Sequence, residues 1–397
     1  MLRRGVPVMG APVRRMESVK RSGEYSAVTR RGVWSPLCTY PGVIFGFTEW
    51  GLTMFTVNKG MATAAGRLFG KRPNVLVVSD GGHIHNYGSG VVAGDGHTGG
   101  DSVMLGESAA EELMALIAGG GATVSVSGDT VTVGTAYGSA VLDGDAGGAL
   151  HLTGDHTVTV TPTKSEWSAV YASTSADDTV PILNAAALVP NGGGVSLVST
   201  DRYRLTAVDF NDAGAIDAPV IVPRVLVMVA KSQPVRARVS LTAGAREGGR
   251  GYARVECDGF TAWADTVEGD YPRVLRLFPS DLPARYTVAD AKRAAAAVKD
   301  IGKRVERNCP VRVSVSDSGV SVAESADERF VATITAIVDD APDFTTRFNP
   351  KFLAEALTVG GKGNVTVRQS ESAKKSVVFE YSDEPRVRAL LMPIVRF

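Results

Sequence analysis

Residues 194–208 read GVSLVSTDRYRLTAV, and this stretch decides how the rest of the chain is interpreted. Apolar and small polar residues alternate in Gly194–Thr200, and the alternation returns in Tyr203–Val208 after a polar pair, Asp201–Arg202. A period of two residues is typical of β-strands, because successive side chains point to opposite faces of the sheet. Two such runs around a short polar turn predict a β-hairpin.

The same pattern occurs twice more, which indicates an internal repeat. Near the N-terminus, Gly51–Val57 is followed by a polar turn and then by Met61–Ala65. Towards the C-terminus, Gly319–Ser325 is followed by a polar turn and then by Phe330–Ile334. Each of these stretches predicts a hairpin that begins a copy of one structural unit.

Helix signals follow each hairpin and lead to a further hairpin. Ser108 and Glu111 fit a capping box, Pro223 stands before a helical pattern, and Asn349 with Pro350 fits a helix start. The predicted helices of this kind are residues 108–117, Arg224–Ser232 and Lys351–Thr358. The helices expected before the hairpins are Met16–Arg30, Ser165–Ser173 and Ala289–Arg304.

The sequence therefore predicts an α+β protein of three similar domains, each with two helices packed on antiparallel sheets. The predicted domains are residues 14–155, 156–285 and 286–397, and a chain of 397 residues suits about two to three domains. Gly81–Gly100 is rich in glycine and has no periodicity, so it predicts a long surface loop in the first domain.

Composition narrows the class of protein further. Lys and Arg together number 42, as do Asp and Glu, so any contact with DNA must come from local asymmetry of charge. The three cysteines, Cys38, Cys257 and Cys309, form no Cys-x-x-Cys pair, which fits a reducing cytoplasm. No apolar run reaches the roughly 18–20 residues of a membrane span. The basic segment Met1–Arg21 lacks the apolar core of a signal peptide, so we expect a cytoplasmic protein.

Motifs for catalysis are missing from the sequence, which contains no GxxxxGK[ST], GxSxG or HExxH pattern. One alternative is a metal-dependent hydrolase built on the Gly-rich stretch, because imidazoles and carboxylates can ligate zinc. The groups concerned are His83, His85, His97, Asp80, Asp95 and Asp101. A flexible loop holds ligands poorly, so a solvated loop is favoured, and we expect no enzyme, no metal and no cofactor.

Basic residues gather on the predicted helices and invite two interpretations. If these helices share one surface, they form a track for DNA phosphates in a chain that is neutral overall. Otherwise they are the solvated faces of ordinary helices. The residues are Arg30, Arg31, Lys231, Lys292, Arg293, Lys299, Lys303, Arg304 and Lys351.

The chain ends in an apolar segment, residues 389–397, which read ALLMPIVRF. Chain ends are usually polar and poorly ordered unless something fixes them. An apolar end of this kind either packs in a core or forms part of an exposed binding groove.

Five segments, taken in order, resemble those of one family. They are residues 178–184 (DTVPILN), 200–205 (TDRYRL), 268–279 (EGDYP and LFP), 348–353 (FNPKFL) and 391–394 (LMPI). The chain resembles the bacterial DNA polymerase III beta subunit, the replicative sliding clamp, either in its cellular form or as a divergent phage version. The resemblance covers residues 155–397 well and residues 14–155 only in outline.

The resemblance implies a non-catalytic processivity factor, in which two chains associate head to tail into a six-domain ring around double-stranded DNA. The basic helix residues would face the hole and contact DNA without regard to sequence. A replicative polymerase and a clamp loader would dock short linear motifs in a hydrophobic pocket between domains two and three. Carried over by position, the pocket comprises Leu183, Thr200, Arg204, Leu205, Pro279, Ser376, Leu390, Leu391, Met392, Pro393 and Ile394.

One departure from the family's pattern bears on this pocket. Arg202 stands where the family usually has glycine, so we expect a narrower or more basic rim. A clamp-like module that binds partner proteins but not DNA is the remaining alternative.

Overall fold

The computed structural model describes residues 54–71, 73, 75–79, 82–86, 90–93, 101–147, 154–246, 251–280, 282–305, 309–324, 329–339, 343–370 and 372–395. All of them belong to one compact unit of the chain, Trp50–Phe397. The helix predicted at Met16–Arg30 lies outside the described residues, as do Arg31 and Cys38. Among the residues that the structure describes, no α-helix combines the length and the hydropathy needed to cross a bilayer.

The described chain repeats one order of elements three times: a strand, a helix, four strands, a helix and three strands. The first copy consists of β1 (Met54–Val57), α1 (Lys59–Leu68), β2 (Leu76–Ser79), β3 (His83–Asn86), β4 (Gly90–Ala93), β5 (Ser102–Leu105), α2 (Glu107–Ile117), β6 (Ala122–Ser127), β7 (Thr130–Thr135) and β8 (Gly138–Asp143). The second consists of β10 (Gly154–Val160), α3 (Lys164–Ser173), β11 (Ala185–Asn191), β12 (Gly194–Thr200), β13 (Arg204–Phe210), β14 (Val220–Pro223), α4 (Arg224–Ser232), β15 (Ser240–Arg246), β16 (Gly251–Cys257) and β17 (Phe260–Asp265).

The third copy follows a short 3-10 helix, η1 (Val274–Leu277). It consists of β18 (Ala284–Val288), α5 (Ala291–Arg304), β19 (Val311–Ser316), β20 (Gly319–Glu324), β21 (Val331–Ile334), β23 (Phe344–Phe348), α6 (Pro350–Thr358), β24 (Val365–Arg368), β25 (Val377–Tyr381) and β26 (Val387–Leu391). Two short extra strands, β9 (Asp145–Ala146) and β22 (Ala336–Val338), fall outside the repeated order. The predicted α+β class is therefore confirmed.

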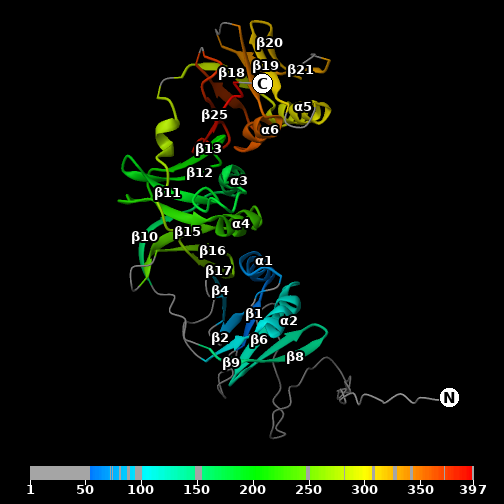
Figure 1. Ribbon diagram of the computed structural model, residues 1–397, viewed down its shortest axis with the longest axis vertical. Helices are drawn as coiled ribbons and strands as arrows, with labels where there is room; N and C mark the ends of the chain where they lie inside the picture. Colours follow the sequence, from blue (N-terminus) through cyan, green and yellow to red (C-terminus); the bar gives the residue numbers. More distant parts are fainter. Residues whose placement is uncertain are drawn as a thin grey trace, which may run out of the picture. The chain divides into compact units, whose positions relative to one another are not determined.

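Pairing between strands joins neighbouring copies into continuous sheets (Figure 1). In each copy the first strand forms one group with the last three, where it pairs with the first of them, and the four inner strands form a second group. The first joint is β17 on β4, where Ala262 lies opposite Val92. The second joint is β13 on β26, where Leu205 lies opposite Leu390. Two nine-stranded sheets result, and the remaining groups form the four-stranded sheets β1-β6-β7-β8 and β21-β20-β19-β23.

The helices form because their sequences supply both caps and an apolar face. Thr163 and Glu166 make a reciprocal capping box at the start of α3, and Asn349 caps α6 with Pro350 in the first turn. In α5 the side chain of Asp290 accepts a hydrogen bond from the backbone N–H of Arg293. Small and branched residues at helical spacing then bury one face of each helix against the sheets.

Helices from neighbouring copies also lie against each other. Within copies α1 packs on α2, α3 on α4 and α5 on α6, and between copies α1 packs on α4. Helices α3 and α6 line one surface groove, to which they contribute Ser168 and Thr358. The order along this helix layer is therefore α2, α1, α4, α3, α6, α5 (Figure 1).

Three predictions for the first copy were wrong. Met61–Ala65, expected as the second strand of a hairpin, lies inside α1, where the Asn58 side chain accepts a hydrogen bond from the Met61 N–H at 2.8 Å. The stretch Gly81–Gly100, expected as a loop, contains β3 and β4, which pair with each other and with β2 and β17. Helix α2 forms where it was expected, but the capping box predicted at Ser108 and Glu111 is wrong, because the N-cap is Gly106 and Ser108 lies inside the helix.

Candidate peptide-binding pocket and helix face

A pocket of about 650 Å³ lies where the turn between β12 and β13 meets the C-terminal tail. Its floor includes Leu205 and Leu390, cross-strand neighbours on β13 and β26. Both belong to a small apolar cluster with Tyr271 and Val274, separate from the main core. The pocket therefore has a rigid apolar base, since its floor is part of a sheet that joins two copies of the repeat.

The turn Thr200–Arg204 is fixed by its own side chains. The Asp201 carboxylate accepts hydrogen bonds from the backbone N–H groups of Tyr203 and Arg204, both at 3.0 Å. The Thr200 hydroxyl donates to the Arg204 carbonyl at 2.7 Å. The Met392 N–H donates to the Tyr203 carbonyl at 2.9 Å, so the C-terminal tail is tied to this turn. Carboxylate acceptors commonly stabilise tight turns in this way.

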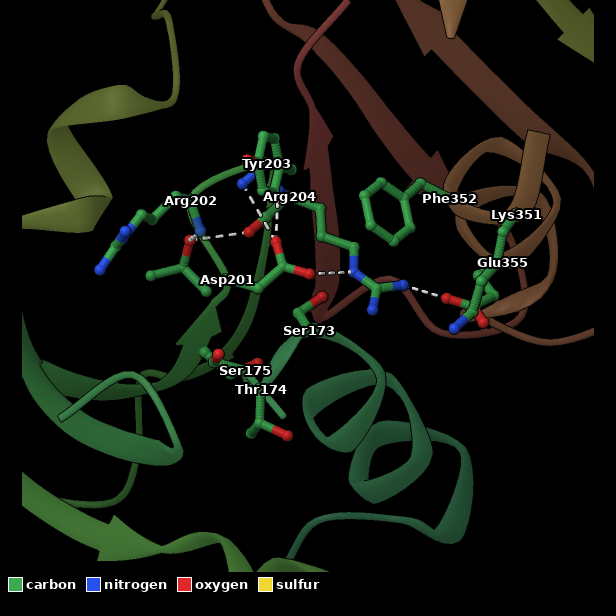
Figure 2. Close-up of polar contacts among 12 residues, drawn as sticks. Ser173, Thr174, Ser175, Asp201, Arg202, Tyr203, Arg204, Lys351, Phe352 and Glu355 are labelled. Carbon is green, nitrogen blue, oxygen red and sulfur yellow. Dashed lines mark hydrogen bonds and ion pairs between the residues drawn. The ribbon is translucent and has the colours of Figure 1, made fainter. Parts of the chain in front are cut away.

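Arg204 connects the second and third copies through its guanidinium (Figure 2). Its Nε lies 2.8 Å from Asp201 Oδ2, and its Nη1 pairs with the Glu355 carboxylate on α6. The guanidinium carbon also lies 4.3 Å from the ring centroid of Phe352. The side chain is only 14% exposed, and two carboxylates balance its charge, so Arg204 acts mainly as a positioning group for the turn.

Arg202, next in the turn, adopts a left-handed backbone conformation with φ of 78°. Among the described non-glycine residues it is the one with positive φ, and a side chain in this region costs about 1–2 kcal/mol. Its side chain is exposed and points away from the Asp201–Arg204 pair (Figure 2). Arg202, which stands in place of the glycine usual in the clamp family, thus puts an exposed cation on the pocket rim.

The structure brings together seven of the eleven residues predicted for the pocket: Thr200, Arg204, Leu205, Pro279, Ser376, Leu390 and Met392. Leu183, Leu391, Pro393 and Ile394 do not line it. Leu391 faces the main core instead, because neighbouring residues on β26 point to opposite sides of the sheet. Lining residues that the sequence did not predict are Tyr203, Leu277, Ser280, Leu282, Ser370, Lys374 and Lys375.

The predicted basic residues occupy the helix layer in different ways. Lys292, Lys299 and Lys303 are exposed, and their spacing of seven and four residues puts them on one face of α5. Arg304 instead pairs with Asp300 at 3.2 Å and stacks on Phe330 at 5.0 Å.

The other basic residues predicted to face DNA differ in how exposed they are. Lys351 on α6 and Arg293 on α5 are exposed. The Lys231 ammonium lies 3.9 Å from the ring centroid of Tyr171, and burial with nearby Arg67 lowers its pKa. Arg30 and Arg31 lie outside the described residues. Among the described helices, α5 carries the largest number of basic residues.

The structure describes two of the three histidines considered as metal ligands, and both are buried in a sheet. His83 and His85 lie on β3 and are buried, with exposures of 4% and 2%. The Ser79 hydroxyl lies 3.2 Å from His83 Nδ1. Burial, and secondarily His83, lower the pKa of His85 to about 4. No cluster of three or more ligand-type residues occurs in the described part of the chain, and Asp80, Asp95 and His97 fall outside it.

A threefold repeat of paired helices on edge-joined antiparallel sheets, with a pocket between two copies, defines the clamp class of α+β folds. No family model matches the chain. Solved structures of DNA polymerase III beta subunits share its fold. The beta subunit of Streptococcus pyogenes aligns with a TM-score of 0.67 at 14% identity, over 86% of this chain and 99% of that one. A Pseudomonas aeruginosa DnaN clamp bound to griselimycin aligns with a TM-score of 0.64 at 16% identity, over 88% of this chain and 100% of that one.

Sequence comparison points to the same proteins. The chain is 32% identical over 189 residues to the beta sliding clamp of Streptomyces coelicolor, covering 46% of this chain and 50% of that protein. It is 28% identical over 175 residues to the beta sliding clamp of Micrococcus luteus, covering 42% of this chain and 55% of that protein. The match spans about half the length of these curated relatives. The chain thus has the fold of the beta sliding clamps and resembles them in sequence.

Proposed function

We propose that this chain is a sliding clamp, a non-catalytic cytoplasmic protein that encircles double-stranded DNA and tethers a replicative polymerase to it. The observation that carries the proposal is the helix layer, which runs through all three copies of the repeat and presents exposed lysines of α5. The proposal includes three domains at residues 14–155, 156–285 and 286–397. The first described strand of the first domain begins at Met54.

The pairing rule within the chain supports the proposed ring closure. Each joint pairs the last strand of one copy with the third inner strand of the copy before it, as β17 does with β4 and β26 with β13. β8 and β21 occupy the equivalent positions, but among the described residues neither pairs with a strand of another copy. Each lies at the edge of its sheet. We infer that β8 of one chain pairs with β21 of a second, which makes a heterologous interface that closes head to tail.

Side chains at these two edges support the pairing. Val141 on β8 is 62% exposed and Val331 on β21 is 57% exposed. The corresponding helices have opposite charge, because α2 carries exposed Glu107 and Glu112 whereas α5 carries an exposed lysine face. Apolar edges and complementary charge are the features that a specific interface needs. The dimer should therefore weaken as salt rises.

DNA contact in this proposal is weak and independent of sequence. Enclosure would retain the duplex, so a few lysine–phosphate contacts suffice and permit sliding. This explains how a chain with no net charge can work on DNA. The pocket above β13 and β26 would receive an extended peptide of the polymerase or the clamp loader, with apolar anchors on Leu205 and Leu390.

A topological experiment tests the ring directly. In a chain with its native cysteines replaced by serine, Val141→Cys and Val331→Cys would be joined by a short bismaleimide in the presence of a circular plasmid. We expect crosslinked dimers that stay with the plasmid at high salt and are released when it is linearised. The single Val141→Cys chain is the control. Crosslinked dimers that leave the circular plasmid at high salt would argue against encirclement.

Before the crosslinking experiment, light scattering across a concentration series should give the mass of the protein in solution. A mass of about twice that of the chain supports the dimeric ring. A monomer at all concentrations would leave the protein-binding module without DNA binding as the better reading.

A further inference from the structure

The charge of the pocket rim is one-sided. The described residues that line the pocket include four cations, Arg202, Arg204, Lys374 and Lys375, and no carboxylate. Since the whole chain carries equal numbers of acidic and basic residues, this composition is local to the pocket. Asymmetry of this kind in a binding site favours ligands of the opposite sign.

Three of these cations are free to act on a ligand. Arg204 is largely buried and balanced by Asp201 and Glu355. Arg202, Lys374 and Lys375 are exposed. Asp177 interacts electrostatically with Arg202, but its carboxylate is exposed and accepts hydrogen bonds from the Thr179 hydroxyl and N–H, so it offsets the charge of Arg202 only partly.

The cations come from two different elements around one apolar floor. Arg202 stands at the tip of the β12–β13 turn, and Lys374 and Lys375 precede β25. Leu205, Leu390 and Met392 lie in the same pocket and present apolar surface. An extended chain places alternate side chains on opposite sides, so apolar residues can enter the pocket while polar neighbours stay at the rim.

We propose that the pocket selects peptides whose apolar anchors are flanked by aspartate or glutamate, with Arg202, Lys374 and Lys375 as the residues that determine this selectivity. The inference rests on the proposed docking function and adds the chemical class of the client segment. The floor supplies the apolar contact, and the rim supplies charge-assisted contacts that strengthen binding and speed association. Because these contacts are solvated, their contribution falls with ionic strength.

Fluorescence polarisation with three synthetic peptides tests the proposal on the full chain. All share leucine and phenylalanine anchors, and the flanking residues are acidic in the first, asparagine and glutamine in the second, and lysine in the third. At low salt we expect the acidic peptide to bind about tenfold more tightly than the neutral one, and the lysine peptide to bind most weakly. Raising the salt should bring the three affinities together.

Charge-reversed variants assign the effect to the rim. Lys374→Glu with Lys375→Glu should reverse the preference between acidic and lysine peptides while leaving the affinity of the neutral peptide within about twofold. Lys362→Glu, at another exposed lysine that does not line the pocket, is the matched control and should leave the order unchanged. Circular dichroism of each variant verifies that the fold is intact.

The possible failures are distinguishable. Equal affinity for acidic and neutral peptides would overturn the charge selection and leave docking itself in place. No binding of any peptide, or no loss of binding in Leu390→Asp, would overturn the docking function and this inference with it. A single-stranded oligonucleotide that competes with the acidic peptide through the same lysines, more tightly than the peptide binds, would assign the rim to nucleic acid instead.

Discussion

Replacing Arg204 by alanine should destabilise the joint between β13 and α6. The substitution removes the hydrogen bond to Asp201, the ion pair with Glu355 and the contact with the Phe352 ring (Figure 2). All three contacts converge on a single guanidinium, so one substitution removes them together (Figure 2). The expected result is a lower free energy of unfolding with an unchanged fold.

The magnitude follows from how exposed each partner is. Asp201 and Arg204 are 12% and 14% exposed, and breaking a buried pair costs about 3–5 kcal/mol. Asp201 keeps two backbone N–H donors, however, so its charge is not left without partners. Glu355 is 34% exposed and adds at most about 1 kcal/mol, and the ring contact adds roughly 0.5–1 kcal/mol. Because these terms overlap, we expect a total of about 2–3 kcal/mol.

Urea denaturation followed by intrinsic fluorescence measures this loss, with Arg204→Lys and Glu355→Gln as companions. Lysine keeps the charge but cannot reach both carboxylates in a fork, so it should recover less than half of the loss. Glu355→Gln alone should cost under about 1 kcal/mol. A loss below about 1 kcal/mol for Arg204→Ala would refute the reasoning. So would a Glu355→Gln cost as large as that of Arg204→Ala.

Three further changes have expected outcomes. Arg202→Gly should raise the free energy of unfolding by up to about 1 kcal/mol in the same denaturation assay, since it relieves the positive φ, while it weakens the binding of acidic peptides. Because the pKa of His85 is lowered to about 4, its contribution to stability is complete above the unfolded value of about 6.5 and is lost as pH falls towards 4. His85→Gln should therefore flatten the decline in melting temperature between pH 6.5 and pH 4, and an unchanged decline would contradict this. Gly360→Ala should cost about 1–3 kcal/mol, because the new methyl group would overlap the buried ring of Tyr381, and a neutral effect by calorimetry would contradict the packing.

Much of the fold could be predicted because its local signals agree with its packing. Helices α3, α5 and α6 begin at side-chain caps, and their apolar residues recur at helical spacing. The hairpin β12–β13 forms where the sequence predicts it, with Val195 opposite Phe210 and Thr200 opposite Leu205. In these segments the preference of the isolated stretch and the tertiary structure point to the same element.

Elsewhere the predictions failed for two different reasons. Met61–Ala65 is rich in alanine, a strong helix former, and follows the Asn58 cap, so its local signals favour the observed helix and the comparison with the other hairpins misassigned it. β3 and β4 lie in glycine-rich sequence, and pairing on both sides buries His83 and His85 despite their polarity.

The sequence predicted only part of the pocket lining, because the lining depends on which face of a strand each residue occupies and on where a loop lies. The family's motif covers both faces of β26, and the two-residue period would have separated Leu390, on the pocket side, from Leu391, in the core. Lys374 and Lys375 belong to no motif that the chain shares with the family. They could be found only after the loop before β25 was positioned in three dimensions.

The shared sheets have a mechanical consequence. At β17–β4 and β13–β26 a row of backbone hydrogen bonds crosses from one copy of the repeat to the next, and such a row resists shear because its bonds must break together. In the proposed dimer the β8–β21 seam would have a row of the same kind, but no segment of chain would link its two sides. The seam would therefore be the joint that separates most readily, because separation within one chain is limited by the segment that connects the copies.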